Sequence, residues 1–218
     1  MNRIGVVRTA AITGLAAALG LAAAVPAMAA PGADPVTTVA DLNGDGEIET
    51  VNAQLVGEDD QLISATVDGT YTSIHLPADS RFGIQAPRVA DLNGDGRAEL
   101  LVARSIGANT TFFAVLHFDG RNLGQVVGPD DQPFSVAEGG GVAAHLGYQC
   151  APLDGGRAFA TVAAESDDVG RPVDQLTYSG TRTVYTLRDG ALSVHDTVPF
   201  SGRPVTDPVL DADSAGCA

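Results

Sequence analysis

The chain has 218 residues, and 27 acidic against 12 basic side chains give it a formal net charge of −15. This acidity argues against nucleic acids as partners, because a polyanion requires cationic side chains to neutralise its phosphates, and it argues equally against anionic membrane surfaces. Hydrophobic residues make up 44% of the chain, enough for a folded core, whereas 5% aromatic residues and the lack of Trp disfavour recognition by ring stacking.

Residues 1–29 have the features of a secretory signal peptide. Two arginines precede an uncharged apolar stretch over residues 10–25, and an Ala-Met-Ala cleavage site follows it. The apolar stretch is short for a membrane span, which needs about 20 residues, so we expect cleavage after Ala29 or Ala30 rather than an uncleaved anchor. The protein is therefore expected to be secreted, extracellular or associated with the cell wall, with residues 30–218 as a β-repeat domain.

Eight consecutive residues, Val-Ala-Asp-Leu-Asn-Gly-Asp-Gly, occur twice in the mature chain, over residues 39–46 and 89–96. The same offset of 50 residues continues to Glu49 and Glu99, which occupy equivalent positions after the two copies. Self-similarity at a fixed offset indicates a repeat architecture, in which each copy is one structural unit.

A third, degenerate unit follows the two copies. The segment from Leu153 to Ala158 resembles the second copy at an offset of 60 residues, and an Asp-Gly hairpin turn follows a strand pattern here as in the first two units. The predicted units cover about residues 36–86, 87–140 and 141–203, and a C-terminal tail follows them.

Strand patterns connect these landmarks. Five segments are rich in β-branched or aromatic residues or alternate apolar with polar residues: 62–67, 100–106, 111–118, 158–163 and 181–187. No part of the mature sequence has a long helical stripe, and Gly and Pro interrupt it too often for long helices. We predict an all-β fold of short antiparallel strands joined by tight turns.

Cys150 and Cys217 are the two cysteines of the chain. An even number of cysteines in an oxidising compartment favours pairing, so we expect a disulfide between them. This bond would fix the tail to the third unit, and two separate thiols are the alternative.

Both copies of the repeated loop place side-chain oxygens at alternate positions. The pattern is Asp-x-Asn-x-Asp-Gly-x-x-Glu, with oxygens at positions 1, 3, 5 and 9 and a Gly that permits a sharp turn. Calcium takes six to eight oxygen ligands in a flexible geometry, whereas magnesium requires a stricter octahedron and zinc prefers His or Cys. We expect two Ca²⁺ sites, with position 7 contributing its backbone carbonyl. The predicted ligands are Asp41, Asn43, Asp45, Glu47, Glu49, Asp91, Asn93, Asp95, Arg97 and Glu99.

Other types of loop fit these residues less well. An EF-hand requires a Glu at position 12 and flanking helices, but position 12 is Asn52 or Val102 and the flanks have strand patterns. Metal-free turns remain the alternative, because Asp, Asn and Gly also favour tight turns, although a turn alone does not require three acids in each copy. The third unit should bind no metal, because its equivalent positions lack suitable oxygens: Ala151, Leu153, Gly155 and Phe159.

With these loops, the segment from about Val36 to Ala103 resembles the FG-GAP/VCBS family of calcium-binding β-propeller repeats. The layout also resembles small secreted actinobacterial repeat proteins. The resemblance implies propeller-blade-like repeats of a small or incomplete β-propeller, and it implies that the loop acids and Asn bind calcium between strands. Propellers usually have four to eight blades, so about three units leave an open array, an array closed by its disulfide, or an assembly of several chains.

No catalytic residue or organic cofactor is assigned, because the histidines stand singly and the sequence contains no motif of nucleophilic catalysis. We expect a secreted, non-enzymatic, calcium-binding protein that has a structural role or binds an extracellular protein or glycan. A secreted hydrolase or a carbohydrate-binding module on a calcium-stabilised scaffold is the alternative.

Overall fold

The computed structural model describes residues 34–218 except 80, 82 and 154–155. The predicted signal peptide therefore lies outside the described residues. Within them, no helix is long and apolar enough to cross a membrane.

The described part of the chain is all-β, as predicted, with only short 3-10 turns besides strands. The first strands are β1 (Val36–Ala40), β2 (Glu49–Leu55), β3 (Asp60–Val67) and β4 (Thr70–Pro77). Next come β5 (Arg88–Ala90), β6 (Glu99–Ile106), β7 (Thr110–Phe118), β8 (Leu123–Gln125) and β9 (Ser135–Gly139). The last strands are β10 (Ala144–Leu153), β11 (Gly156–Ser166), β12 (Thr177–Arg188) and β13 (Ala191–Pro204). The 3-10 turns are η2 (Val173–Gln175), η3 (Pro208–Leu210) and η4 (Ser214–Cys217).

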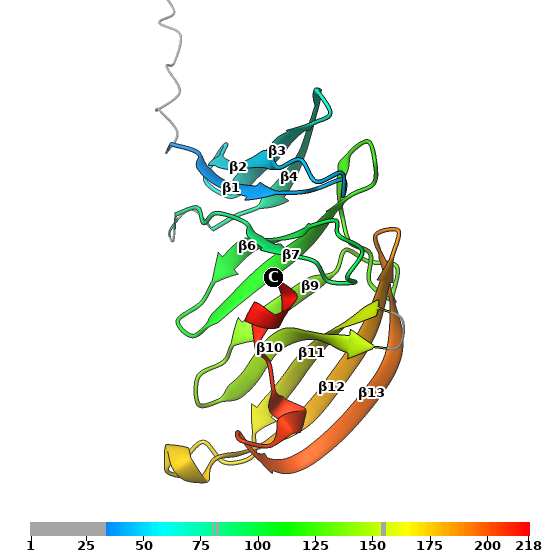
Figure 1. Ribbon diagram of the computed structural model, residues 1–218. Helices are drawn as coiled ribbons and strands as arrows, with labels where there is room; N and C mark the ends of the chain where they lie inside the picture. The colour runs from blue at the N-terminus through cyan, green and yellow to red at the C-terminus, as the bar shows by residue number, and fades with distance from the viewer. Residues whose placement is uncertain (1–33, 80, 82, 154–155) are drawn as a thin grey trace, which may run out of the picture. The chain divides into compact units, whose positions relative to one another are not determined.

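The strands form three antiparallel meanders of four strands each (Figure 1). The first unit is β1–β4, the second is β5–β8 and the third is β10–β13; "unit" has this meaning from here on. The five predicted strand segments fall on β3, β6, β7, β11 and β12. The repeated loop connects the first two strands of the first unit and, again, of the second.

β9 is an additional strand that the sequence did not reveal. It pairs with β7 on one side and with β10 on the other, so the second and third units form one continuous sheet while the first unit keeps a sheet of its own. The units are therefore not three separate blades, because two of them share backbone hydrogen bonds through β9.

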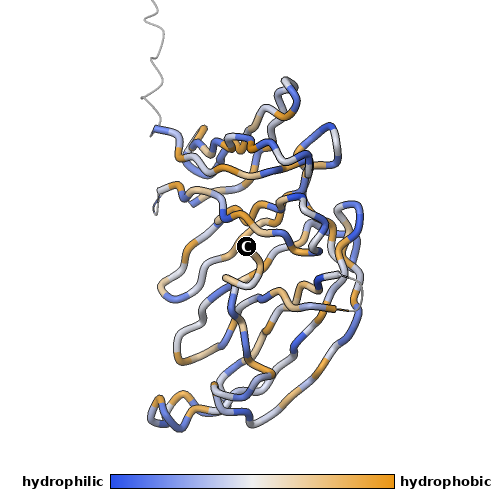
Figure 2. Tube along the Cα trace, in the orientation of Figure 1, coloured by the Kyte–Doolittle hydropathy of each residue, from blue (hydrophilic) through white to orange (hydrophobic). Residues whose placement is uncertain are grey.

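Apolar and polar residues alternate along many of the strands (Figure 2), and the buried apolar residues form three cores. One core lies between the first and second units and includes Val51, Ile63, Leu100 and Leu116, of which none is exposed. A second core joins the second and third units and includes Phe113 and Phe159. A third packs Leu210 of η3 against β11 and β12. The tail thus covers part of the third unit.

Cys150 of β10 and Cys217 of η4 form the predicted disulfide. Cys217 is 1% exposed and belongs to the core between the second and third units. The end of the tail is therefore buried, and the disulfide attaches its last turn, η4, to β10.

Candidate metal-binding loops

The two repeated loops occupy equivalent places in the fold. Loop 1 (residues 41–48) connects β1 to β2, and loop 2 (residues 91–98) connects β5 to β6. The two residues that flank each loop pair with each other across the hairpin, Ala40 with Glu49 and Ala90 with Glu99. This pairing brings the first and ninth positions of each loop to the same end of a hairpin.

The Asp at the first position holds each loop in a tight curl. In loop 1, Asp41 Oδ1 accepts a hydrogen bond from Gly44 N at 2.7 Å, and its Oδ2 accepts one from Gly46 N at 2.9 Å. Asp91 accepts the same two bonds in loop 2, from Gly94 N at 2.7 Å and Gly96 N at 3.2 Å. The predicted sharp turn is present, because the position-6 glycines have φ of +87° and +84°, which a side chain would strain.

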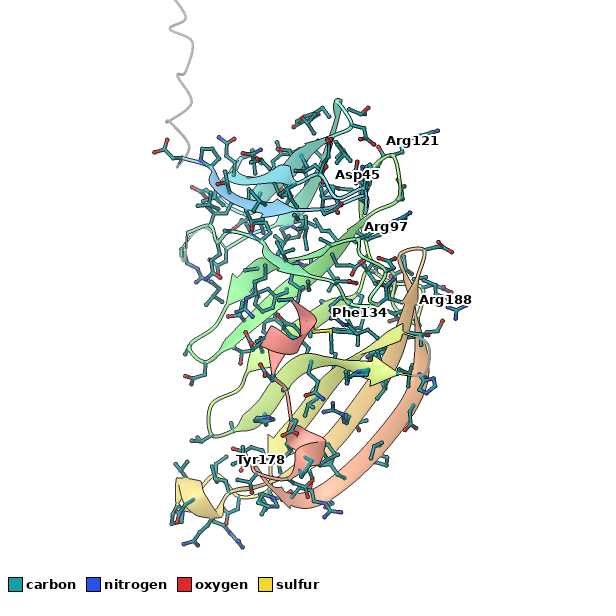
Figure 3. All side chains as sticks on the ribbon, viewed as in Figure 1. Asp45, Arg97, Arg121, Phe134, Tyr178 and Arg188 are labelled. Carbon is teal, nitrogen blue, oxygen red and sulfur yellow. A yellow bond between two sulfur atoms is a disulfide. The ribbon has the colours of Figure 1, made fainter. Side chains whose placement is uncertain are left out.

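The third and fifth positions continue this inward pattern. Asn43 Oδ1 accepts from Asp45 N at 3.1 Å, and Asp45 Oδ1 accepts from Glu47 N at 2.7 Å. The N–H of Glu47, followed by the amide of Asn43, lowers the pKa of the Asp45 carboxyl. Loop 2 repeats both bonds, with distances of 3.2 Å and 2.8 Å. The side chains of Glu47 and Arg97 at position 7 are exposed, while their backbone N–H groups donate within the loops. Arg97 is labelled in Figure 3.

The Glu at the ninth position is buried in both copies. Glu49 is 8% exposed and Glu99 is 4% exposed, and each Oε2 accepts a hydrogen bond of 2.8 Å, from Leu42 N and Leu92 N respectively. Burial, together with the negative charges of Asp95 and Asp91, raises the pKa of Glu99 to about 8. A buried carboxylate beside two others is unfavourable unless a positive charge is near, and no described cation forms an ion pair with either Glu.

The oxygen atoms of each loop are of the kind that calcium binds, but the side chains that carry them do not converge on one point. Each loop offers carboxylate and amide oxygens and contains neither His nor Cys, which suits a hard cation. Within the described residues, however, no three His, Cys, Asp or Glu side chains are grouped closely enough to hold a metal ion. Several oxygens instead accept hydrogen bonds from the loop's own N–H groups, so coordination would require small rotations of these side chains.

Each loop also packs against the following unit. Ala98 N donates to Asp41 O at 2.8 Å, and Arg157 N donates to Asn93 O at 3.2 Å. A Cβ on Gly44 would lie 3.0 Å from the side chain of Arg97, and one on Gly94 would lie 3.1 Å from the side chain of Arg157. Arg97 and Arg157 therefore occupy equivalent places, which agrees with the alignment of the degenerate third unit.

The third unit has no equivalent oxygen cluster among its described residues. Ala151 and Leu153 lie on β10, Gly155 lies outside the described residues, and Phe159 is fully buried among Phe134, Tyr148 and Tyr185. An aromatic ring in the core thus replaces the buried Glu of the first two units.

The tail supports loop 2 in a way that the sequence did not indicate. Asp91 N donates to Cys217 O at 2.7 Å, and Arg157 Nη1 donates to Asp91 O at 2.7 Å. The disulfide therefore holds a tail carbonyl against the first residue of loop 2.

Asp-Gly turns provide further acids near both loops. Asn43 Nδ2 donates to Asp68 Oδ2 at 3.2 Å, which places the β3–β4 turn beside loop 1. Beside loop 2, a small cavity of about 110 Å³ is lined by Asp95, Glu99, His117 and Asp189, among others. Burial lowers the pKa of His117. The Asp-Gly pairs correctly indicated hairpin turns, but sequence reasoning did not relate those turns to the loops.

Residues 41–102 match the FG-GAP-like repeat family model. The FG-GAP-like segment begins at Asp41 and ends within β6, so it contains both loops and the first unit's remaining strands. The predicted resemblance to FG-GAP repeats is confirmed for this segment, whereas the VCBS and actinobacterial resemblances stay predictions. Neither the curated proteins nor the solved structures gave a match.

Proposed function

We propose that this chain is a secreted, non-enzymatic β-repeat protein that binds one Ca²⁺ in loop 1 and one in loop 2. The observation that carries the proposal is the duplicated buried Glu, at Glu49 and Glu99, each of which closes a loop that has oxygen-bearing side chains at positions 1, 3 and 5. Bound calcium supplies the positive charge that such a group of carboxylates lacks.

The chain's own residues have separate tasks in this proposal. The loop N–H groups orient Asp41 and Asp91, and the strand pairs hold the Glu at the far end of each loop. Because the loops also contact the following unit, ordering them would stabilise the contacts between units, namely Ala98 N with Asp41 O and Arg157 N with Asn93 O.

The proposed location rests on the signal-peptide pattern of residues 1–29, and the disulfide suits an oxidising compartment. In that setting the protein would act as a rigid module whose exposed faces bind an extracellular protein or glycan.

The experiment that tests the calcium sites is titration calorimetry of the metal-stripped mature chain, with Glu49→Gln, Glu99→Gln and the matched control Glu165→Gln. Glu165 is exposed on β11 of the third unit, where it pairs with Ala144 and Ser179 rather than with a residue of either loop. We expect two calcium ions per wild-type and control chain and one per single loop variant. Thermal melts that superimpose with calcium and with chelator would contradict the proposal, because a ligand that binds the folded state must raise its stability.

A further inference from the structure

A groove lies between the first and second units, at the ends of the strands opposite the two loops. Its volume is about 740 Å³, within the range of small-ligand sites. Arg104 and Phe112 line it from the second unit, Ser135 lines it from β9, and Glu58 and Asp59 line it from the first unit. We call it the Arg104 groove.

A β-bulge directs Arg104 out of the regular strand. On β6, Ala103 pairs with Phe113 and Ser105 pairs with Phe112, so Arg104 is the extra residue of the register shift. β2 of the first unit pairs with β3 through the equivalent stretch without any shift. Bulges change the direction of a side chain and occur often beside binding and active sites.

The first unit holds this bulge in place through a buried amide. Gln61 is 1% exposed, and its Nε2 donates to Ala103 O at 2.8 Å and to Pro77 O at 3.1 Å. The residue before Arg104 is therefore fixed across the boundary between the units.

Arg104 has no acceptor in the described part of the protein. Its Nε is buried without a hydrogen-bond partner, and no described carboxylate pairs with its guanidinium. Elsewhere, half-buried arginines are satisfied: Arg88 pairs with Glu138 and Arg157 donates to Asp91 O. A buried N–H without an acceptor is costly, and a ligand carboxylate satisfies a guanidinium well because the two groups match in charge and geometry.

The facing wall is acidic overall but includes one cation: Asp79 and Arg81 also line the groove, and Arg81 pairs with Asp79 at 2.6 Å. Glu58 and Asp59 lie in the β2–β3 turn, and Ala78 N donates to Asp59 O at 3.0 Å, which ties this turn to the end of β4. Glu58 forms no ion pair with any described residue. Phe112 is 44% exposed between the two walls and offers an apolar surface.

We propose that the Arg104 groove binds a zwitterionic ligand of the amino-acid or peptide class, with a carboxylate on Arg104, an ammonium on the Glu58–Asp59 wall and an apolar part on Phe112. The inference deepens the partner-binding part of the proposed function and does not depend on calcium. Two sources of this chemistry are possible, the ends of a small peptide and the charged side chains of a partner protein.

The test is an NMR titration of the ¹⁵N-labelled mature chain with the dipeptide Gly-Phe, its N-acetylated form and its C-terminal amide. A blocked tripeptide, acetyl-Glu-Gly-Lys-amide, carries both charges on side chains and represents the second source. We expect saturable shifts of the amides from Arg104 to Phe112 with Gly-Phe or with the tripeptide, and at least about tenfold weaker binding of both capped dipeptides, since each loses one charged contact.

Arg104→Gln should weaken binding at least about tenfold, whereas the matched control Arg188→Gln, at the exposed end of β12, should leave it unchanged (Figure 3). Should Arg104→Gln not fold, Glu58→Gln with Asp59→Asn tests the other wall. Lack of saturable shifts with both zwitterionic probes, equal binding of the capped forms, or unchanged affinity in the groove variants overturns the proposal. Performing the titration with calcium and with chelator separates it from the calcium sites, because loss of those sites leaves the predicted pattern intact.

Discussion

The first and second units share one loop and one strand order, but they differ on one face of the sheet. Glu49 and Glu99 occupy equivalent places, so the residues after them can be compared pair by pair. The face of the second unit that meets the first carries residues with no exposed surface: Leu100, Val102, Ala114 and Leu116. The equivalent residues of the first unit are polar and exposed or half-buried: Thr50, Asn52, Ser64 and Thr66. The strand registers support the comparison, because Asn52 pairs with Ser64 as Val102 pairs with Ala114.

The opposite face does not differ in this way. Val51 and Ile63 are buried against the second unit, and their equivalents Leu101 and Phe113 are buried against the third. Both of these units thus have an apolar face for the unit that follows, but of the two only the second has one for a unit that precedes. A polar outer face is the mark of a terminal repeat in an array. The first unit therefore ends the array, and a ring closed by apolar packing on this face is disfavoured.

Removing the disulfide has the largest expected effect and distinguishes the two loops. Replacing both cysteines by Ser should lower the free energy of unfolding by about 4 kcal/mol, because the bond closes a long loop in the unfolded chain. Amide hydrogen exchange should accelerate at loop 2, which contacts Cys217 O, well before loop 1. Equal acceleration in both loops would show that the tail does not support loop 2 selectively.

Val102→Asn should be the next largest change. It replaces a fully buried side chain with an amide that has no partner in the core, so the free energy of unfolding should fall by about 3 kcal/mol. Urea denaturation measures the effect. A loss below about 1 kcal/mol would mean that this face is not packed as described.

The raised pKa of Glu99 predicts a smaller, pH-dependent change in the free energy of unfolding of the metal-free protein. Its pKa is about 8 in the folded state against an ordinary 4.5, so the folded state holds this proton more tightly than the unfolded state does. The contribution is fully present below pH 4.5 and is lost as the pH rises towards 8, with a total on the order of 2 kcal/mol after allowance for relaxation. Thermal melts in chelator from pH 5 to pH 8 should show the decline. Glu99→Gln should flatten it, and Glu165→Gln should not.

Calcium should reverse this dependence, because a metal ligand must be deprotonated. Between the same pH values, stability in excess calcium should rise or stay level while stability in chelator falls. Parallel curves in the two conditions would show that Glu99 does not bind the ion.

The features that the sequence predicted correctly are those that depend on residues close together in the chain or on simple counts. The duplicated Asp-x-Asn-x-Asp-Gly-x-x-Glu located both loops, because the glycines and Asp side chains act within a few residues of one another. The alternating segments located five strands, and the cysteine count predicted the pair. β9 was missed because Ser135–Gly139 has little apolar alternation and gains its strand character from two long-range partners. The contact of Asp91 with Cys217 and the bulge at Arg104 also depend on residues distant in sequence, which pattern alone does not relate.

Asn52→Val should have the smallest effect on stability and completes the comparison with Val102→Asn. It makes the first unit resemble the second at one position of a half-exposed face, so the free energy of unfolding should change by less than about 0.5 kcal/mol.

Extending the substitution to Thr50→Leu and Thr66→Leu should create an exposed apolar patch, and sedimentation velocity should then detect concentration-dependent self-association. A strictly monomeric triple variant would indicate that curvature or the neighbouring loop, rather than the polarity of this face, ends the array. Association of the variant alone, with the wild type monomeric, would instead show that three polar residues are enough to separate a terminal unit from an internal one.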